Sequence, residues 1–448
     1  MNEKTTEPPF KGGEGFLTLD WINLAGKIAV IRLDLNSPVR DGVLIDDERI
    51  RAHAGTVAEV ARKADKVILL SHQGRPGEND FIPLRQHWRA LEKYAGIPIL
   101  YPWKDKSDEE IIAMGEEAVI GDRIMEMLQG LKKGQVILLE NVRLLPYETV
   151  EKSVEEHAKS PLVERITSLG EIVFVLDGFS VAHRPHCSVI GFAQWPTVAG
   201  RVMEKELRAL TKAFMDPKEP IVLITGGVKV SDSIKSIQNF LERARGKAFK
   251  VLTCGAVGEV FLAAKGIKLP DPVIEFMRHK KIIDQIEPAR LLLAEHSKAI
   301  EVPVDVAIDV GGKREEVDIG EIGRHADKMI KDIGGKTAYG YAERIITAKT
   351  IIGNGTAGVY EEREFAHGQS ILLQAAGWAA KYKGATTLFG GGDTTASLRQ
   401  QLSGDLTREI FTSTSGKAFL RALSSREGPR ALAGVNVLLL KQSPVSGR

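Results

Sequence analysis

The sequence has almost no net charge. It contains 61 lysine and arginine residues against 59 aspartate and glutamate residues, which gives a formal charge of +2. No overall electrostatic field therefore favours nucleic acid or an anionic membrane, and neither is expected as a partner. A site for an anion must come from a local cluster of basic side chains.

Cysteine and long apolar runs are also scarce. The two cysteines, Cys187 and Cys254, lie in different halves of the chain and lack the spacing of metal ligands. Residues 1–24 show no signal peptide. The longest apolar runs, such as Ile172–Leu176 and Val435–Leu440, have the length of a strand rather than of a membrane span. A reduced, cytoplasmic location is expected.

The chain does contain a regular alternation of short β-branched runs with longer helix-patterned segments. At 448 residues it is long enough for two large domains. The alternation predicts an α/β fold with two doubly wound, Rossmann-like parallel-sheet domains joined by a hinge. The predicted strands are Ile28–Asp34, Lys66–Leu70, Val136–Glu140, Ile172–Asp177, Ile221–Thr225, Phe249–Thr253, Thr350–Gly353 and Thr386–Phe389.

Prolines mark the expected domain break, which lies between Trp195-Pro196 and Pro217–Pro220. A helical pattern at Met203–Phe214 is the candidate connector. The resulting division is an N-terminal domain of residues 1–198, a hinge helix at 199–216, a C-terminal domain at 217–415, and a segment, 416–448, that returns toward the N-terminal domain.

Basic residues follow the strands of the first half. Ligands of parallel sheets bind beyond the carboxyl ends of the strands. Several guanidinium groups at one edge repel one another unless an anion joins them, and arginine suits bidentate binding of phosphate or carboxylate. A single arginine of this kind is more often a solvated charge or half of a salt bridge. Four in equivalent positions predict an anion site: Arg49, Arg75, Arg143 and Arg184.

Glycine-rich loops follow the strands of the second half. Gly226 and Gly227 come after one strand, with Lys229 placed to stabilise transferring oxygens, but their spacing is that of neither a Walker A loop nor a dinucleotide fingerprint. Another loop begins at Asn354 and reaches Glu361. That glutamate suits ribose hydroxyls and suits the start of a helix equally well.

The sequence Gly391-Gly392-Asp393-Thr394 lies between a predicted strand and a predicted helix. The glycines allow close approach of the backbone, and the helix start favours a phosphate. A carboxylate would repel that phosphate unless a hard cation such as Mg²⁺ lay between them. Phosphate and Mg²⁺ at one site indicate a nucleotide-using phosphotransferase, and an anion site on the other domain favours a kinase that closes over two substrates.

Seven sequence blocks, in order, resemble the phosphoglycerate kinase family, and the resemblance runs from about Leu17 to about Leu438. The Asp-Leu-Asn-Ser-Pro and His-Gln-Gly forms are most similar to the archaeal branch. The blocks are Arg32–Pro38, Ser71–Pro76, Leu139–Arg143, Asp177–Arg184, Gly226–Asp232, Asn354–Glu361 and Gly391–Thr394. The resemblance implies reversible phosphoryl transfer between ATP and 3-phosphoglycerate, with ADP and 1,3-bisphosphoglycerate as products, in glycolysis and gluconeogenesis.

The resemblance also implies a role for each matching residue. In the N-terminal domain, Arg75, Arg143 and Arg184 would bind the 3-phosphate, and the other substrate-binding residues would be Asp34, Asn36, Arg49, His72, Gln73 and Gly74. Arg49 and Lys229 would stabilise the transferring phosphoryl group, and no general base is needed because the acceptor carboxylate is already ionised. Asp393 would hold Mg²⁺. The nucleotide would lie against Gly226, Gly227, Lys229, Asn354, Glu361, Gly391, Gly392, Asp393 and Thr394.

The chain departs from the family pattern at two places. Most members have a second lysine four residues after Lys229, where this chain has Ser233. Members similar to the archaeal branch often lack that lysine too. The family's Ser-Thr-Gly-Gly-Gly-Ala loop is replaced by Ser413-Thr414-Ser415-Gly416-Lys417-Ala418. The loss of two glycines is expected to make positive φ angles costly there, while Lys417 adds a charge.

The sequence alone leaves two other functions open. A catalytically weak paralogue could bind triose phosphates or nucleotides as a sensor or scaffold, and the altered glycine loop favours it. A Rossmann oxidoreductase is a third reading, against which the missing Gly-x-Gly-x-x-Gly fingerprint counts. A monomer is expected, with a homodimer as the alternative.

Overall fold

The computed structural model describes residues 15–402 and 404–439. The chain forms two compact units. One runs to Leu207 and includes the segment from Arg430 on, and the other is Arg208–Pro429. Helix α9 (Arg201–Phe214) contains the boundary between them.

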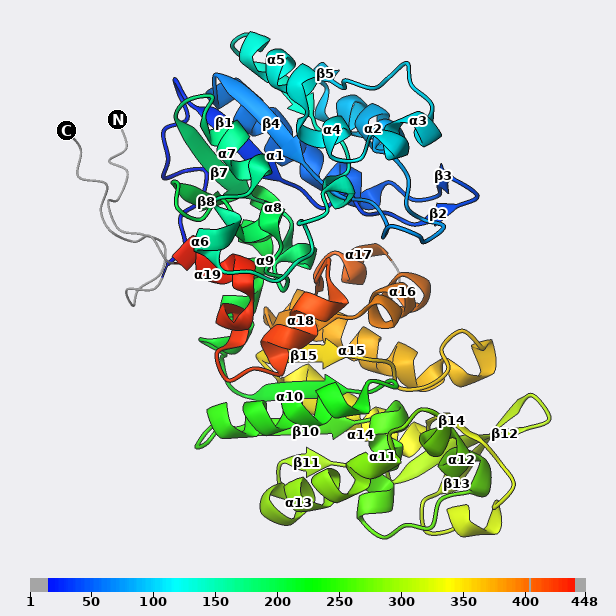
Figure 1. Cartoon of the computed structure of the whole chain (residues 1–448). Helices are drawn as coiled ribbons and strands as arrows, with labels where there is room; N and C mark the ends of the chain where they lie inside the picture. Colours follow the sequence, from blue (N-terminus) through cyan, green and yellow to red (C-terminus); the bar gives the residue numbers. More distant parts are fainter. Residues whose placement is uncertain (1–14, 403, 440–448) are drawn as a thin grey trace. The chain divides into compact units, whose positions relative to one another are not determined.

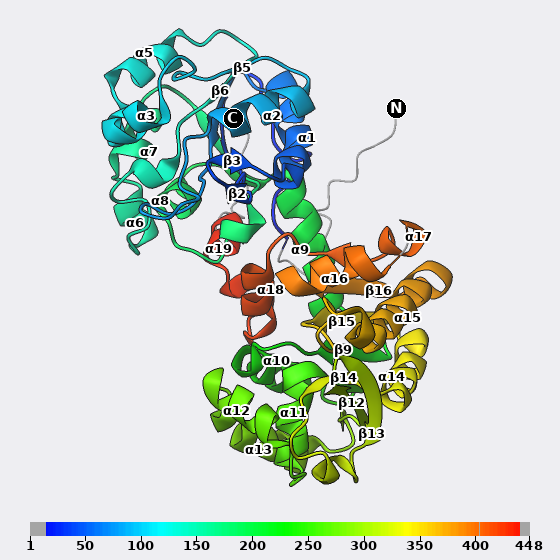
Figure 2. The same cartoon turned by 90° about the vertical axis from the view of Figure 1, so that its right-hand side faces the viewer.

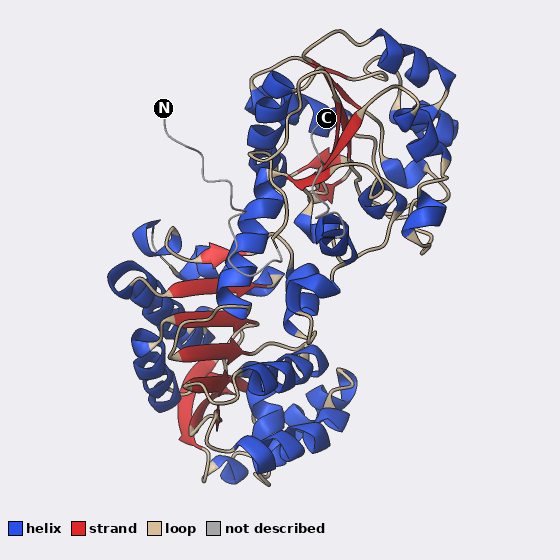
Figure 3. Cartoon of the chain, turned by 90° about the vertical axis from the view of Figure 1, so that its left-hand side faces the viewer, coloured by secondary structure: helices blue, strands red, loops and turns tan. Residues whose placement is uncertain are grey.

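The first unit is built on a six-stranded sheet with the order β5-β6-β4-β1-β7-β8, in which every pairing is parallel. All five residues of β1 and of β7 are buried, as expected for strands covered on both faces. Helices lie on both sides of the sheet (Figure 3). The strands are β1 (Ile28–Arg32), β4 (Lys66–Leu70), β5 (Ile99–Leu100), β6 (Gln135–Leu138), β7 (Ile172–Leu176) and β8 (Thr197–Ala199).

The helices of the first unit include one from the end of the described chain. Val435 lies in helix α19, because an apolar run of this length is not distinguished from a buried helix by its pattern. This helix packs against α8 and β8 (Figure 1), and Ala182 O accepts a hydrogen bond from Gly434 N at 2.8 Å. The helices are α1 (Glu48–Lys63), α2 (Arg85–Ala95), α3 (Asp108–Met114), α4 (Glu116–Ile120), α5 (Asp122–Gly130), α6 (Val154–His157), α7 (Pro161–Thr167), α8 (Cys187–Ile190) and α19 (Ala433–Leu439).

The second unit has its own parallel six-stranded sheet, with the order β11-β10-β9-β15-β16-β17. A three-stranded antiparallel sheet, β13-β12-β14, accompanies it and was not predicted. The strands are β9 (Ile221–Thr225), β10 (Phe249–Thr253), β11 (Ile300–Glu301), β12 (Asp305–Val310), β13 (Lys313–Asp318), β14 (Ile330–Ile333), β15 (Thr350–Asn354), β16 (Thr386–Gly390) and β17 (Phe411–Thr412).

Helices cover both faces of the second large sheet. Helices α14 and α15 lie side by side on one face, and α10 and α11 lie on the other (Figure 2). The helices are α10 (Val230–Arg243), α11 (Gly255–Ala264), α12 (Asp271–His279), α13 (Ile286–His296), α14 (Gly335–Thr347), α15 (His367–Lys383), α16 (Gly392–Gln401), α17 (Gly404–Thr407) and α18 (Gly416–Leu423). Two parallel sheets with helices on both faces confirm the predicted fold class.

Both cysteines, Cys187 and Cys254, are buried and free. Across residues 15–402 and 404–439, no helix is both long and apolar enough to cross a bilayer.

Candidate active site

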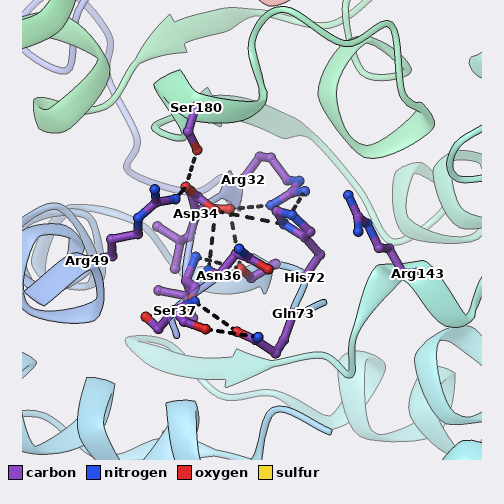
Figure 4. Close-up of polar contacts among 12 residues, drawn as sticks. Arg32, Asp34, Asn36, Ser37, Arg49, His72, Gln73, Arg143 and Ser180 are labelled. Atoms are coloured by element: carbon purple, nitrogen blue, oxygen red, sulfur yellow. Dashed lines mark hydrogen bonds and ion pairs between the residues drawn. The ribbon is translucent and has the colours of Figure 1, made fainter. Parts of the chain in front are cut away.

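The carboxyl ends of β6, β4, β1 and β7 are neighbours in the first sheet, so the polar residues that follow these strands meet at one edge. Figure 4 shows Asp34 at the centre of this cluster. Its buried carboxylate accepts hydrogen bonds from Ser180 Oγ and Arg49 Nη1. Burial alone would raise the pKa of Asp34, but the charge of Arg49 and the hydrogen bond from the Ser180 hydroxyl hold it well below its ordinary value. Asp34 is therefore a fixed negative charge.

Asn36, Gln73 and Gly74 tie two of these loops together. Asn36 Oδ1 accepts a hydrogen bond from Gly74 N at 2.8 Å. The Gln73 side chain exchanges hydrogen bonds with both backbone groups of Ser37, at 2.9 and 3.0 Å, and also contacts His87. The side-chain amide of Gln73 is thus fully engaged with protein groups, and Gln73 holds the loop that contains Ser37 in place. Gly74 has φ +63°, and a Cβ there would meet Asp80 O at 2.4 Å.

His72 is buried beside the cationic side of the cluster. Its Nδ1 lies 3.3 Å from Arg32 Nη2 and 3.9 Å from Asp34 Oδ1. Burial, the nearby charge of Arg32 and, less strongly, that of Arg143 lower the pKa of His72 well below its usual value, although Asp34 acts in the opposite direction. A neutral imidazole follows, with Nδ1 able to accept from Arg32 and Nε2 able to donate.

Arg75, Arg143 and Arg184 form a group of cations that act on one another. Burial lowers the pKa of Arg143 to about 10, and the charges of Arg184, Arg32 and Arg75 add to the shift. Burial and the charge of Arg75 likewise lower the pKa of Arg184. Arg143 donates to the carbonyl of Gly74, and Arg75 is exposed. A bound anion would relieve mutual repulsion of this kind, and the phosphate site at these arginines stays a prediction.

The structure adds three residues that the sequence reasoning did not assign. Arg32 is 1% exposed, and it donates to Ser188 Oγ at 2.7 Å and to the carbonyl of Leu33. His53 accepts from Asp34 N at 3.3 Å and pairs with Asp177 at 2.8 Å. Ser180 holds Asp34. Of these three residues, only Arg32 could have been found from the sequence, because it is a charged residue at the end of an otherwise apolar strand.

In the second unit, three glycine loops interlock at the ends of β9, β10 and β15. Gly226 N donates to Asn354 O at 2.9 Å, and Gly227 N donates to Thr356 O at 2.9 Å. A Cβ at Gly226 would meet Thr356 O at 2.3 Å, and one at Gly355 would meet Gly226 O at 2.0 Å. The close contact between these loops therefore requires glycine at position 226.

The predicted phosphate and metal residues lie next to these loops. Thr394 is buried, and its Oγ1 accepts from Gly355 N at 2.8 Å, so its hydroxyl links the two loops. Gly391, with φ +108°, precedes α16 and brings Gly392 and Asp393 into its first turn. Asp393 and Glu361 are exposed.

The pKa of Tyr360 responds to the charges of both Asp393 and Glu361. Burial raises the pKa of this tyrosine, and the charges of Glu361 and Asp393 raise it further. Both carboxylates therefore lie within electrostatic reach of the same phenol. Lys229 occupies the N-cap position of α10 without a side-chain capping hydrogen bond and is exposed, whereas Ser233, one turn later, is buried.

The non-glycine residues of the loop at 413–418 do not adopt positive φ. Across the described residues, Asp41 and Lys281 are the only non-glycine residues with positive φ, so the cost expected of such angles does not arise in this loop. Ser415 instead caps α18 by accepting from Ala418 N at 3.1 Å. Gly416 is retained where a Cβ would meet Gly391 Cα at 3.0 Å, and Lys417 is exposed.

A pocket of about 130 Å³ lies against the same glycine loops. Its lining includes Gly227 and Gly255 from two of these loops, and apolar side chains such as Leu262 and Phe276. Concave, mainly apolar surfaces with a few polar groups suit a planar base.

The residues present fit a magnesium ion that a nucleotide brings with it. No group of three or more histidine, cysteine, aspartate or glutamate side chains forms a metal cage in the part of the chain that the structure describes. Mg²⁺ is usually held by one or two carboxylates together with phosphate oxygens and water. The exposed carboxylate of Asp393, in the first turn of a helix, matches that arrangement.

Comparison with known proteins gives a consistent answer. A model of the phosphoglycerate kinase family matches residues 19–426. The phosphoglycerate kinase of Methanothermobacter thermautotrophicus is 37% identical over 92% of this chain and 95% of its own length. That of Saccharolobus solfataricus is 36% identical over 92% and 95%.

A solved structure agrees with these sequence matches. The crystal structure of phosphoglycerate kinase from Pyrococcus horikoshii is 33% identical, with a TM-score of 0.77, over 94% of this chain and 99% of that one. These relatives are archaeal, as the motif forms indicated. The chain therefore belongs to the phosphoglycerate kinase family.

Proposed function

We propose that the two clusters divide the substrates of the family's reaction between them. That reaction is reversible phosphoryl transfer between ATP and 3-phosphoglycerate, and the family uses Mg-ATP. The cluster of the first unit takes 3-phosphoglycerate, and the glycine-loop edge of the second unit takes the nucleotide. The observation that carries this division is the convergence of Arg75, Arg143 and Arg184 in a chain with almost no net charge.

In the first unit, the three arginines bind the 3-phosphate. Each guanidinium can bond phosphate oxygens, and the bound dianion removes their mutual repulsion. Asn36 and the neutral His72 face the glycerate end with uncharged polar groups, while Gln73 and Gly74 fix the loop. Asp34 keeps Arg49 in place through their ion pair. The carboxylate of the substrate then needs no general base, because it is already ionised at neutral pH.

In the second unit, the base enters the pocket and the phosphates lie along the starts of α10 and α16. Free N–H groups at these helix starts suit anions, and Lys229 stands at the first of them. Glu361 takes the ribose hydroxyls, Asn354 lines the site, and Gly391, Gly392 and Thr394 shape the phosphate loop. Asp393 would hold the magnesium ion, which neutralises phosphate charge when bound.

The chemical step relies on charge stabilisation. Arg49 and Lys229 supply positive charge to the oxygens of the transferring group, in a reaction whose transition state has little other covalent chemistry for the protein to perform. We propose a monomer as the working state, with a homodimer as the alternative that sedimentation would reveal.

The test of the proposed division is separate calorimetric titration of 3-phosphoglycerate and of Mg-ADP. Replacing Arg143 with methionine should abolish binding of 3-phosphoglycerate and leave Mg-ADP affinity within about twofold. Equal loss of both affinities, or of neither, contradicts the assignment. A chain that binds both ligands without turnover in an assay with ATP, Mg²⁺ and 3-phosphoglycerate would be a sensor instead.

A further inference from the structure

Helix α11 turns one face toward the pocket of the second unit. Ala256, Glu259 and Leu262 lie three residues apart along this helix, and all of them line the pocket. Two of these side chains are apolar. The third, Glu259, brings a carboxyl group into a lining that is otherwise suited to a flat apolar ligand.

The Glu259 carboxyl is buried without a protein partner. The residue is 7% exposed, and its Oε2 has no hydrogen-bond partner among the residues that the structure describes. Burial raises the pKa of Glu259 to about 8. At neutral pH the group is therefore mainly a neutral acid, with one O–H donor and one C=O acceptor.

The neighbouring charged residues of the lining differ from Glu259, because they are already engaged. Lys331 pairs with Asp309 and Glu362. Asp332 pairs with Arg314 at 2.8 Å and accepts from Gly368 N at 2.7 Å. Burial is the cause of the raised pKa of Glu259.

An unpartnered polar group in a buried site is costly unless something bonds to it. The pocket wall offers such a group next to the space that the proposed function gives to the base. The helix rises about 1.5 Å per residue, so Glu259 lies about 6 Å along the axis from Gly255 at the loop end. A purine that passes the glycine loop would thus bring its far edge toward this carboxyl.

We propose that Glu259 recognises the amino edge of adenine as a neutral acid. Its C=O accepts a hydrogen bond from the adenine N6 amino group, and its O–H donates to the ring nitrogen N1. This inference rests on the proposed function, because it places the base of the nucleotide in this pocket. It adds a specificity-determining residue to that site.

Guanine presents the opposite pattern, with O6 as an acceptor and N1–H and N2–H₂ as donors. An ionised carboxylate would match the two donors in a bidentate pair. Among the described residues Glu259 Oε2 has no hydrogen-bond partner, and burial raises the pKa of Glu259, so the neutral form and adenine are favoured.

The experiment compares ADP with purine riboside 5′-diphosphate, which lacks the 6-amino group, by calorimetry on the whole chain. The wild-type protein should bind ADP at least about tenfold more tightly, since a site built to hydrogen-bond a group rejects the analogue without it. Glu259→Leu should reduce that ratio to within about twofold of one. Glu259→Gln should keep most of the ratio, because its amide retains one donor and one acceptor. Glu275→Gln, at an exposed site on α12, is the matched control.

The outcomes distinguish a wrong role for Glu259 from a wrong assignment of the nucleotide site. A ratio in the Leu variant equal to that of wild type, with normal ADP binding, overturns the role of Glu259 and leaves the proposed nucleotide site intact. Tighter binding of GDP than of ADP overturns it as well. If the Leu variant does not fold, a wild-type ratio near one, or loss of the ratio in the Gln variant, overturns the proposal. Absence of ADP binding to wild type overturns the proposed function itself.

Discussion

Replacing Arg49 with alanine should lower kcat much more than it lowers the affinity for 3-phosphoglycerate. Arg49 lies in the first turn of α1, and its contact with Asp34 holds its guanidinium at the substrate cluster. Arg75, Arg143 and Arg184 remain to bind the substrate. Removal of one charge-stabilising donor from a transition state costs about 2.7–4 kcal/mol, which is on the order of a 100- to 1,000-fold fall in kcat.

The same change has a smaller structural cost. Asp34 loses its ion pair and keeps the Ser180 hydroxyl and the backbone contact with Asn36. The pKa of Asp34 should rise toward its ordinary value, because the charge of Arg49 is the main influence that lowers it against burial. Since the Arg49 side chain is 38% exposed, solvent screens the pair, and we expect a loss of only about 1 kcal/mol in the free energy of unfolding.

Steady-state kinetics with varied 3-phosphoglycerate at saturating Mg-ATP measures kcat and the KM for 3-phosphoglycerate. Arg51→Ala is the matched control, because Arg51 lies two residues later on α1, is 63% exposed and pairs with Asp47. It should leave kcat within about twofold of wild type. Arg49→Lys should recover part of the loss by restoring the charge without the planar guanidinium. Equal kcat in Arg49→Ala and Arg51→Ala would refute the assigned role.

Three further predictions concern the other sites. Asp393→Ala should weaken Mg-ADP binding about tenfold or more and leave 3-phosphoglycerate binding nearly unchanged in separate titrations; a parallel fall in both would contradict the two-site division. Lys417→Gly should raise the KM for ATP and weaken its dependence on salt, since a cation near the phosphate loop would be lost; an unchanged KM and salt response would make Lys417 a solvated surface residue. Burial lowers the pKa of His87 and of His186 to about 3, so the folded chain should resist protonation while the unfolded chain takes up protons below pH 6.5. The free energy of unfolding should therefore fall as pH drops from about 6.5 toward 3, and His87→Gln should flatten this slope in denaturant titrations; an identical slope would contradict the assignment to His87.

The parallel sheets were predictable because their strands are short, fully apolar runs separated by helical patterns. Ile221–Thr225 and Phe249–Thr253 have the predicted limits. The antiparallel sheet escaped prediction because β13 (Lys313–Asp318) is mostly charged and shows no buried face in its pattern. The helix at Ala433–Leu439 escaped for the opposite reason, since an apolar run alone does not distinguish helix from strand.

The site was predictable where one rule covered several residues. Arginines after adjacent parallel strands must converge, and Arg143 and Arg184 do so. The positions of residues in the loops after the strands did not predict which way their side chains point. Gln73 bonds to the backbone of Ser37 in the neighbouring loop, and Thr394 bonds to Gly355, because buried polar groups take the nearest backbone partners. The sequence did not predict that the Glu259 carboxyl lines the pocket without a hydrogen-bond partner for Oε2 among the described residues.

The central claim is that this chain transfers a phosphoryl group between Mg-ATP and 3-phosphoglycerate by means of these two clusters. The most direct measurement is the rate of ADP formation with Mg²⁺, ATP and 3-phosphoglycerate, for wild type and for Arg143→Met. We expect turnover that needs all three components in the wild type and a fall of at least about 100-fold in kcat/KM for 3-phosphoglycerate in the variant. Binding of both ligands without turnover in the wild type would contradict the account.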